Sequence, residues 1–229
     1  MTAAWLTGDA LAFDTETTGV DPLNDRIVTA CAVLVGKAGA SFRGRWLLNP
    51  GVPIPPSATA IHGITDEKAQ ADGAPPEHAL PAISVTLAEA WRNGLPVIIM
   101  NAHYDLTLLQ AELARCGHEP LTIGPVLDPL VIDRGLDPYR KGKRTLTALA
   151  AHYNVKQDGA HSSDGDALTA ARIVWKQAHE PRIERMSLAD MQEWQQKRHA
   201  EWAGQFELWL RQQGKPEVIN RDWPVRRAA

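Results

Sequence analysis

Two carboxylates follow the first apolar segment of the chain. Residues 11–19 read LAFDTETTG, so Asp14 and Glu16 come directly after Leu-Ala-Phe and are separated by one threonine. In a β-strand, side chains two residues apart point to the same face, so these acids are expected to project together. Neighbouring carboxylates repel each other unless a cation or a proton lies between them. The pair therefore indicates a cation site, or else a strand that ends in water.

Two later motifs carry further groups of the same kind. Asp105 lies in IIMNAHYDLTLLQAEL, where an apolar strand gives way to a helix. Ligands of open α/β sheets gather at the carboxyl ends of strands, although aspartate is also a common helix N-cap. In AHSSDGDALTAAR, His161 precedes Asp166 by five residues at the start of a helix, and Ser163 and Asp164 are good helix caps. Each motif alone thus has an ordinary structural explanation.

The elements that must position these residues follow from the apolar pattern. The sequences LAFDTE, RIVTACAVLV and SFRGRWLLNP predict three strands, the last two as a hairpin. The proline-rich segment NPGVPIPPSATAIHGIT predicts an ordered loop rather than a helix. Helical spacing is found from about Glu77 to Trp91 and in LTLLQAELARCG, TLTALAAHY and DALTAARIVWKQAHE, which alternate with short strands at PVIIM and GPVLD. This order predicts an α/β fold with a mixed sheet.

The composition changes after Pro181. Residues 183–212 carry apolar and aromatic side chains roughly along one helical stripe, and four of the eight tryptophans lie between residues 175 and 209. We expect this helix to pack its stripe on the preceding part of the chain. The alternative is a docking surface for a partner protein.

The composition of the whole chain limits the classes of function. Its 229 residues, with 44% hydrophobic and 22% charged side chains, are typical of one good-sized globular domain with or without an appendage. The net charge of −3 means that any binding of a polyanion must be local. The two cysteines have no metal-ligand spacing, which argues against structural zinc and favours a reducing, cytoplasmic location. No signal peptide and no membrane-spanning segment is expected.

Taken together, the motifs resemble those of one family. The order D-x-E, N-A-x-x-D and H-x-x-x-x-D resembles the DnaQ-like 3′–5′ exonucleases, the DEDDh branch of the ribonuclease H-like superfamily. The resemblance covers most of residues 9–178, and FDTETTG matches the first motif residue for residue. It implies a ribonuclease H-like mixed five-stranded sheet flanked by helices. The exonuclease domain is expected to span residues 1–180 and a helical C-terminal extension residues 181–229.

The resemblance also implies the site. Four carboxylates are expected to converge on two divalent metal ions: Asp14, Glu16, Asp105 and Asp166. With a bound phosphodiester they carry about five negative charges, which two divalent cations nearly neutralise. Oxygen ligands favour Mg²⁺ or Mn²⁺ over zinc. In such a site one ion activates water and the other stabilises the leaving oxygen. His161 is expected to be the general base, which must be neutral to accept a proton.

Substrate contacts are expected at three further residues. The resemblance places Thr17 and the loop with His62 near the terminal nucleotide, and Asn101 near the phosphates. A turn histidine that bonds its own loop is the alternative for His62. The basic run RKGKR at residues 140–144 is a candidate to follow phosphates, although a solvated basic loop is the commoner outcome.

Two motifs depart from the family pattern. The second motif commonly reads HNAxFD and here reads MNAHYD, so Met100 replaces a histidine while Tyr104 keeps the aromatic position. In the last motif, residues 162–165 are polar or glycine where the family has small and apolar ones. Asp164 therefore competes with Asp166 for the metal, and the motif spacing favours Asp166. No catalytic group is lost, so an active enzyme is expected.

The leading hypothesis is a metal-dependent exonuclease that releases nucleoside 5′-monophosphates from the 3′ end of single-stranded DNA. It would serve proofreading or repair, either alone or with a DNA polymerase. The first alternative is the same chemistry on RNA, because the choice depends on whether the site tolerates a 2′-hydroxyl. The second alternative is a catalytically silent nucleic-acid-binding module, and the intact motif residues argue against it.

Overall fold

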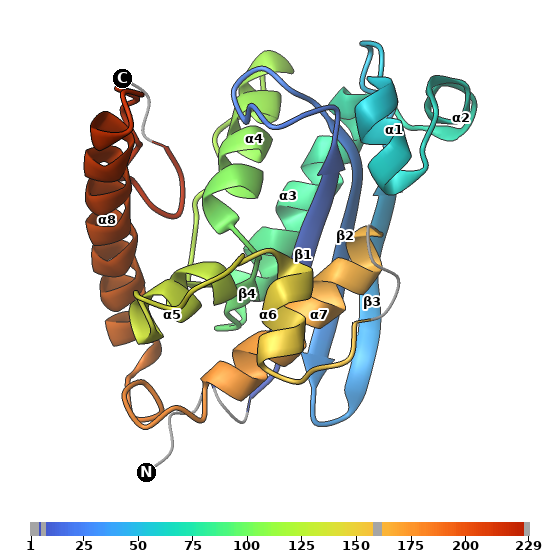
Figure 1. Cartoon of the computed structure of the whole chain (residues 1–229). Helices are drawn as coiled ribbons and strands as arrows, with labels where there is room; N and C mark the ends of the chain where they lie inside the picture. Colours follow the sequence, from blue (N-terminus) through green and yellow to red (C-terminus); the bar gives the residue numbers. More distant parts are fainter. Residues whose placement is uncertain (1–4, 6–7, 158–161, 227–229) are drawn as a thin grey trace.

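A mixed five-stranded sheet forms the centre of the molecule (Figure 1), as predicted. The computed structural model describes residues 5, 8–157 and 162–226. The strand order is β3-β2-β1-β4-β5, in which β1 pairs antiparallel with β2 and parallel with β4. The β2–β3 pair is antiparallel, as the predicted hairpin requires, and β4–β5 is parallel. The strands are β1 Ala10–Thr17, β2 Ile27–Gly36, β3 Gly39–Leu47, β4 Val97–Ile98 and β5 Val126–Leu127.

Helices cover both faces of this sheet (Figure 1). Their bounds among the described residues are α1 Pro56–His62, α2 Asp66–Asp72, α3 Pro76–Arg92, α4 Ala102–Arg115, α5 Pro129–Leu136, α6 Leu146–His152, α7 Ser163–Gln177 and α8 Leu188–Gln212. None of them combines the length and the apolar character needed to cross a bilayer.

The alternation of side chains along β1 separates two cores. Leu11 and Phe13 pack with residues of α3 and α4 on one face. Ala10 and Ala12 pack on the other face with a cluster that includes Ala167 of α7. The small side chains on both sides of this contact let α7 lie close to β1, because little volume separates the two backbones. This close approach brings the start of α7 to the acidic end of β1.

The proline-rich segment was wrongly predicted as a loop. It contains α1, which begins at Pro56 after Pro55 and ends at Gly63 in the left-handed conformation. Proline is compatible with the first turn of a helix, where its missing N–H has no intrahelical partner anyway. The helix α5 begins in the same way at Pro129, after the N-cap Asp128, and was not predicted. In both places proline starts a helix instead of interrupting one.

The helix α8 lies along α5 and the open edge of the sheet (Figure 1). Gln192 accepts from Val126 N at 2.8 Å and donates to Val126 O at 3.0 Å. Gln195 accepts from Asp128 N at 2.8 Å and also donates to Val126 O. The two glutamines therefore take the place of a neighbouring strand, because they satisfy the outward backbone groups of β5.

Candidate active site

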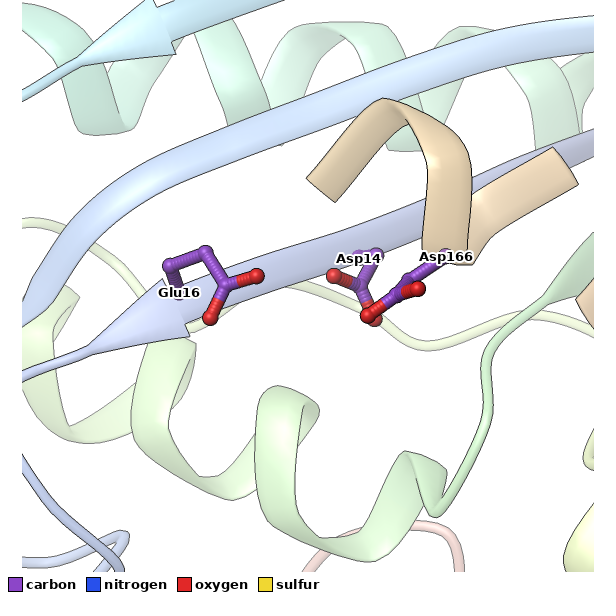
Figure 2. Close-up of side chains that lie close together, drawn as sticks. All are labelled: Asp14, Glu16 and Asp166. Carbon is purple, nitrogen blue, oxygen red and sulfur yellow. The ribbon is translucent and has the colours of Figure 1, made fainter. Parts of the chain in front are cut away.

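The two acids of the first motif lie on the central strand. Asp14 and Glu16 belong to β1 and project to the same side of the sheet, as their spacing predicts (Figure 2). Asp166 faces them from the first turn of α7. One carboxylate oxygen from each of the three residues lies within 4.8 Å of the others. Two segments that are far apart in the sequence thus supply one acidic cluster.

The structure distinguishes the two acids of the last motif. Ser162 is the N-cap of α7, and its side chain accepts from Gly165 N. Asp164 forms an ion pair of 2.8 Å with Arg45 on β3. Only Asp166 is grouped with the acids of β1. This geometry supports Asp166 over Asp164 as a candidate metal ligand, in agreement with the motif spacing.

The fourth acid approaches from α4. Asp105 is buried in the first turn of this helix, and its Oδ1 accepts a hydrogen bond of 2.6 Å from Thr15 Oγ1 on β1. Asp105 is therefore not the N-cap, a position that Asn101 occupies. It lies outside the cluster of three, yet its negative charge contributes to raising the pKa of both Asp14 and Glu16. Asp105 thus borders the cluster through Thr15.

Burial and mutual repulsion dominate the electrostatics of this region. Burial raises the pKa of Asp14 well above its usual range, and the neighbouring carboxylates raise it further. Burial, followed by the charges of Asp166 and Asp105, raises the pKa of Glu16 to about 7. Burial also raises the pKa of Asp105 to about 7, although the Thr15 hydrogen bond opposes this. Among the described residues, no ion pair joins a basic side chain to Asp14, Glu16 or Asp105.

A pocket of about 560 Å³ opens beside the cluster. Glu16 lines it, together with all three expected substrate residues, Thr17, His62 and Asn101. The volume is within the range of small-molecule sites. The pocket therefore brings together residues from β1, α1 and the start of α4.

Tyr104 also lines this pocket and was not predicted to have a role there. Its hydroxyl lies 2.9 Å from Thr17 Oγ1, and both hydroxyls donate to the carbonyl of Gly19, at 2.5 and 2.7 Å. Burial raises the pKa of Tyr104 to about 12, so the phenol stays protonated. The aromatic position in MNAHYD was the available signal, but the contact across to β1 depends on the fold.

His62 has both a structural and a pocket-lining position. Its Nδ1 accepts from Ile64 N at 3.1 Å, which is the turn bond that the sequence left as an alternative. Burial lowers the pKa of His62, so the neutral ring is favoured and its proton lies on Nε2.

Asn101 is held in the left-handed conformation, with φ 63°. Its backbone N–H and that of Ala102 donate to the two carboxylate oxygens of Asp128, each at 3.0 Å. Asp128 is fully buried and also caps α5 by accepting from Leu130 N. This one carboxylate therefore fixes the start of α4, and with it Asn101. The expected general base, His161, lies outside the described residues.

The family is defined by a match over most of the sheet and its helices. The family model described as "Exonuclease" matches residues 11–174. The chain is 30% identical to the DNA polymerase III subunit epsilon of Treponema pallidum over 159 residues, which are 68% of this chain and 70% of that protein. It is 29% identical to Exonuclease DPD1, chloroplastic/mitochondrial, of Arabidopsis thaliana, over 71% of this chain and 54% of that protein. The chain therefore belongs to the exonuclease family, and within it to the DnaQ-like 3′–5′ exonucleases.

Solved structures show the same fold. E. coli Exonuclease I in complex with a dA16 oligonucleotide matches with a TM-score of 0.63 and 18% identity, over 77% of this chain and 42% of that one. Exonuclease X in complex with 5′ overhanging duplex DNA matches with a TM-score of 0.59 and 21% identity, over 81% of this chain and 99% of that one. The chain spans only 12% of a DNA polymerase III PolC-type protein of Caldanaerobacter subterraneus, to which it is 30% identical. Relatives of this domain are thus found in proteins of very different length.

Proposed function

We propose that this chain is a metal-dependent exonuclease that hydrolyses single-stranded DNA from its 3′ end and releases nucleoside 5′-monophosphates. The observation that carries the proposal is the cluster of Asp14, Glu16 and Asp166 at the edge of a pocket of about 560 Å³. Its family supports the reaction, and the oligonucleotide complex of Exonuclease I supports single-stranded DNA as the substrate. A role in proofreading, with a DNA polymerase as partner, is supported by the epsilon relative.

The residues present fit divalent cations. Asp14, Glu16 and Asp166 offer oxygen ligands within 4.8 Å of one another, and Asp105 adds charge next to them. Because the pKa values of Asp14 and Glu16 are raised, these acids bind protons tightly when nothing else neutralises them. Oxygen ligands of this kind suit Mg²⁺ or Mn²⁺. Two such ions, when bound, supply water activation and stabilisation of the leaving oxygen.

The residues of the chain have complementary tasks around the scissile bond. The pocket beside Glu16 holds the terminal nucleotide, with Thr17 and Tyr104 forming its β1 side through their shared contact with Gly19. Asn101, exposed at the start of α4, reaches the phosphate. His62 lines the same pocket with a neutral ring, whose Nε2–H is buried and has no hydrogen-bond partner among the described residues.

His161 is the residue that we propose for proton transfer. It immediately precedes the N-cap of α7, the helix that carries Asp166. A neutral imidazole there takes the proton of the attacking water, and the reaction adds water across the phosphodiester bond. The products are a nucleoside 5′-monophosphate and a strand with a new 3′-hydroxyl. No redox partner and no covalent enzyme intermediate is required.

The direct test uses single-stranded DNA and RNA of the same sequence, labelled at either the 3′ or the 5′ end. With Mg²⁺ or Mn²⁺, labelled mononucleotide is expected at once from the 3′-labelled DNA, while the 5′ label shortens stepwise. Excess EDTA should stop both. Faster cleavage of RNA would indicate that the protein is an exoribonuclease. Undiminished cleavage in EDTA would contradict the metal site.

Asp166→Asn and Asp164→Asn form a matched pair in the same helical turn. The first change is expected to abolish cleavage because it removes an acid of the cluster. The second removes an ion pair with Arg45 that is exposed on both sides, and such pairs contribute little to stability. Equal loss of activity in both variants would contradict the assignment of Asp166.

A further inference from the structure

A second cleft lies between the segment after α5 and the outer surface of α8. It encloses about 500 Å³ and is lined by four arginines, Arg134, Arg140, Arg144 and Arg198, but by only one acid, Glu201. Lys141 and Lys143 are exposed on the same segment. In a chain with a net charge of −3, this is a strong local concentration of positive charge. A polyanion is attracted to such a patch whatever the charge of the whole protein.

The positive charge of this cleft exceeds what the neighbouring acids neutralise. Arg140 and Arg144 share the single buried carboxylate of Asp133. Arg198 pairs with Glu201 at 2.9 Å. Arg134 lies over the ring of Trp202, with Cζ 3.4 Å from the ring centre, and forms none of the ion pairs found among the described residues.

Several arginine donors beside the cleft have no hydrogen-bond partner among the described residues. The Nε–H groups of Arg134, Arg140 and Arg198 are buried and donate to no other atom of the described residues. Burial lowers the pKa of Arg134 to about 10; the nearby carboxylates of Asp128 and Asp133 oppose this shift, and the charge of Arg144 adds to it. The cleft thus retains positive charge that an anionic ligand can neutralise, although the three Nε–H groups themselves lie beneath its surface.

Aromatic side chains are interleaved with these arginines. Tyr139 is 88% exposed on the segment after α5, although it lines the cleft. Opposite it, on α8, Trp202 stacks on Phe206 with ring centres 5.4 Å apart, and Phe206 stacks on Trp209 at 5.7 Å. Flat rings beside guanidinium groups are the combination that binds single-stranded nucleic acid, because bases stack while phosphates pair with the cations.

The position of the cleft connects it to the active site. The segment with Tyr139 leads into α6, whose Leu149 belongs to a buried cluster against which Met100 also packs. Met100 immediately precedes Asn101, which lines the pocket beside Glu16. In Figure 1, α6 follows the segment after α5 and lies in front of the sheet, beside α7. The α8 side of the cleft lies beyond residues 11–174, the part of the chain that the family model matches.

We propose that this cleft binds the single-stranded DNA that extends in the 5′ direction from the nucleotide in the active site. Arginines contact its phosphates, and Tyr139 stacks on a base. The inference rests on the proposed function and adds a second, remote contact to it. The cleft therefore increases affinity for long strands without taking part in the hydrolysis itself.

The test compares variants that leave the fold intact. Tyr139→Ala removes an exposed ring, and Arg198→Gln removes a partly exposed charge whose ion pair among the described residues is with Glu201. Arg185→Gln is the matched control, because Arg185 is also an arginine in a weak surface pair, 83% exposed and outside the cleft. Binding of a long 5′-fluorescein oligothymidylate is measured in EDTA, so that it does not depend on cleavage.

Tyr139→Ala is expected to weaken binding about tenfold, within the range for loss of one base–aromatic stack. Arg198→Gln should make the dependence of log K on log salt shallower by about 0.7, the effect of one phosphate contact on a single strand. Arg185→Gln should bind as the unchanged protein does. With metal, KM for the long strand should rise in the two cleft variants while kcat stays the same. Hydrolysis of the 4-nitrophenyl ester of thymidine 5′-monophosphate should not change.

Equal binding by all four proteins would overturn the proposal. Displacement of the oligonucleotide by polyglutamate as readily as by unlabelled DNA would also overturn it, because the cleft would then select an acidic protein rather than a nucleic acid. Failure of the proposed function would look different. The unchanged protein would not release the 3′ nucleotide, whereas the binding comparison in EDTA would still decide whether the cleft holds DNA.

Discussion

Two groups of buried or partly buried carboxylates in this molecule have opposite surroundings. Asp133 on α5 is fully buried and accepts from two guanidinium groups, Arg140 and Arg144, and from the Tyr153 hydroxyl at 2.9 Å. The acids around β1 instead face one another, and their pKa values are raised by burial and by mutual repulsion. The first region carries its own cations, and the second does not.

The difference distinguishes carboxylates that stabilise the fold from carboxylates that are available to bind a cation. A buried charge is tolerated when the fold supplies its counter-charge, as it also does for Glu112, which pairs with Arg26 and Arg115. A group of acids without counter-charge destabilises the metal-free fold, and such an arrangement is expected where a cation or a reacting group has to bind. The contrast therefore supports the proposal that the acids of β1 and α7 bind metal ions.

The largest effect is expected for Asp14→Asn. This change removes one of the three clustered carboxylates, and metal-assisted stabilisation of a transition state is worth several kcal/mol. We expect cleavage to fall by at least about a thousandfold. Single-turnover cleavage of 3′-labelled DNA measures it. Retention of most activity would contradict the proposal that the acids around β1, unlike Asp133, bind catalytic metal ions.

His161→Ala should have the next largest effect. All four carboxylates remain, so metal binding should largely survive while turnover falls by about 10²–10⁴-fold, as is typical of general-base catalysis. The rate of the unchanged enzyme should rise with pH through the histidine pKa, whose reference value is about 6.5. A loss below about tenfold with the same pH profile would assign proton transfer to another group.

Asp133→Asn tests the compensated region through stability. The change leaves two largely buried guanidinium groups without their carboxylate, which typically costs about 3 kcal/mol or more. Tm is expected to fall by about 10 °C for a chain of this size. Hydrolysis of the small nitrophenyl ester should change little compared with the Asp14 variant. An unchanged Tm would show that the arginines are satisfied in another way.

The smallest effect concerns the metal-free protein at different pH values. Glu16 and Asp105 have pKa values of about 7 when folded, against about 4 when unfolded, so the folded state binds more protons between these values. The resulting stabilisation is present at low pH and is lost as the pH rises through about 7. In EDTA at about pH 8, Asp14→Asn should therefore melt a few degrees above the unchanged protein, because it relieves repulsion.

At about pH 5 this difference in Tm should disappear, since protonation then relieves the same repulsion in the unchanged protein. Comparing the two proteins at each pH cancels the contributions of other groups, such as His199, whose pKa is lowered to about 4 by burial. A variant that melts well below the unchanged protein at every pH would mean that Asp14 stabilises the fold.

The sequence predicted the acids better than their surroundings. The i, i+2 spacing of Asp14 and Glu16 was sufficient to place them on one face, because strand geometry alone determines this. Two other contacts could not be predicted without the fold, namely the hydrogen bond between Thr15 and Asp105 and the ion pair between Asp164 and Arg45. Each joins residues about 90 or more positions apart in the sequence. The helix α1 was missed because proline was interpreted as a turn signal, although it also begins helices.

The sequence showed the two components of the cleft beside α8, but not that they lie next to each other. The basic run was visible in the sequence, and so was the aromatic stripe of residues 183–212. That the two lie against each other follows from the packing of α8 on α5, which the glutamine contacts to β5 help to fix. Such side-chain pairing with an edge strand has no periodic signal in a single sequence.

Calorimetric titration of Mn²⁺ into the metal-free protein tests whether the acids of β1 and α7 bind metal ions. It is carried out near pH 7 in two buffers with different ionisation enthalpies, for the unchanged protein, Asp14→Asn and Asp133→Asn. We expect the unchanged protein and Asp133→Asn to bind Mn²⁺ and to release protons, because the metal displaces protons from acids with pKa values of about 7. Asp14→Asn should bind far more weakly. Absence of binding to the unchanged protein, or equal binding to Asp14→Asn, would contradict the proposed metal site.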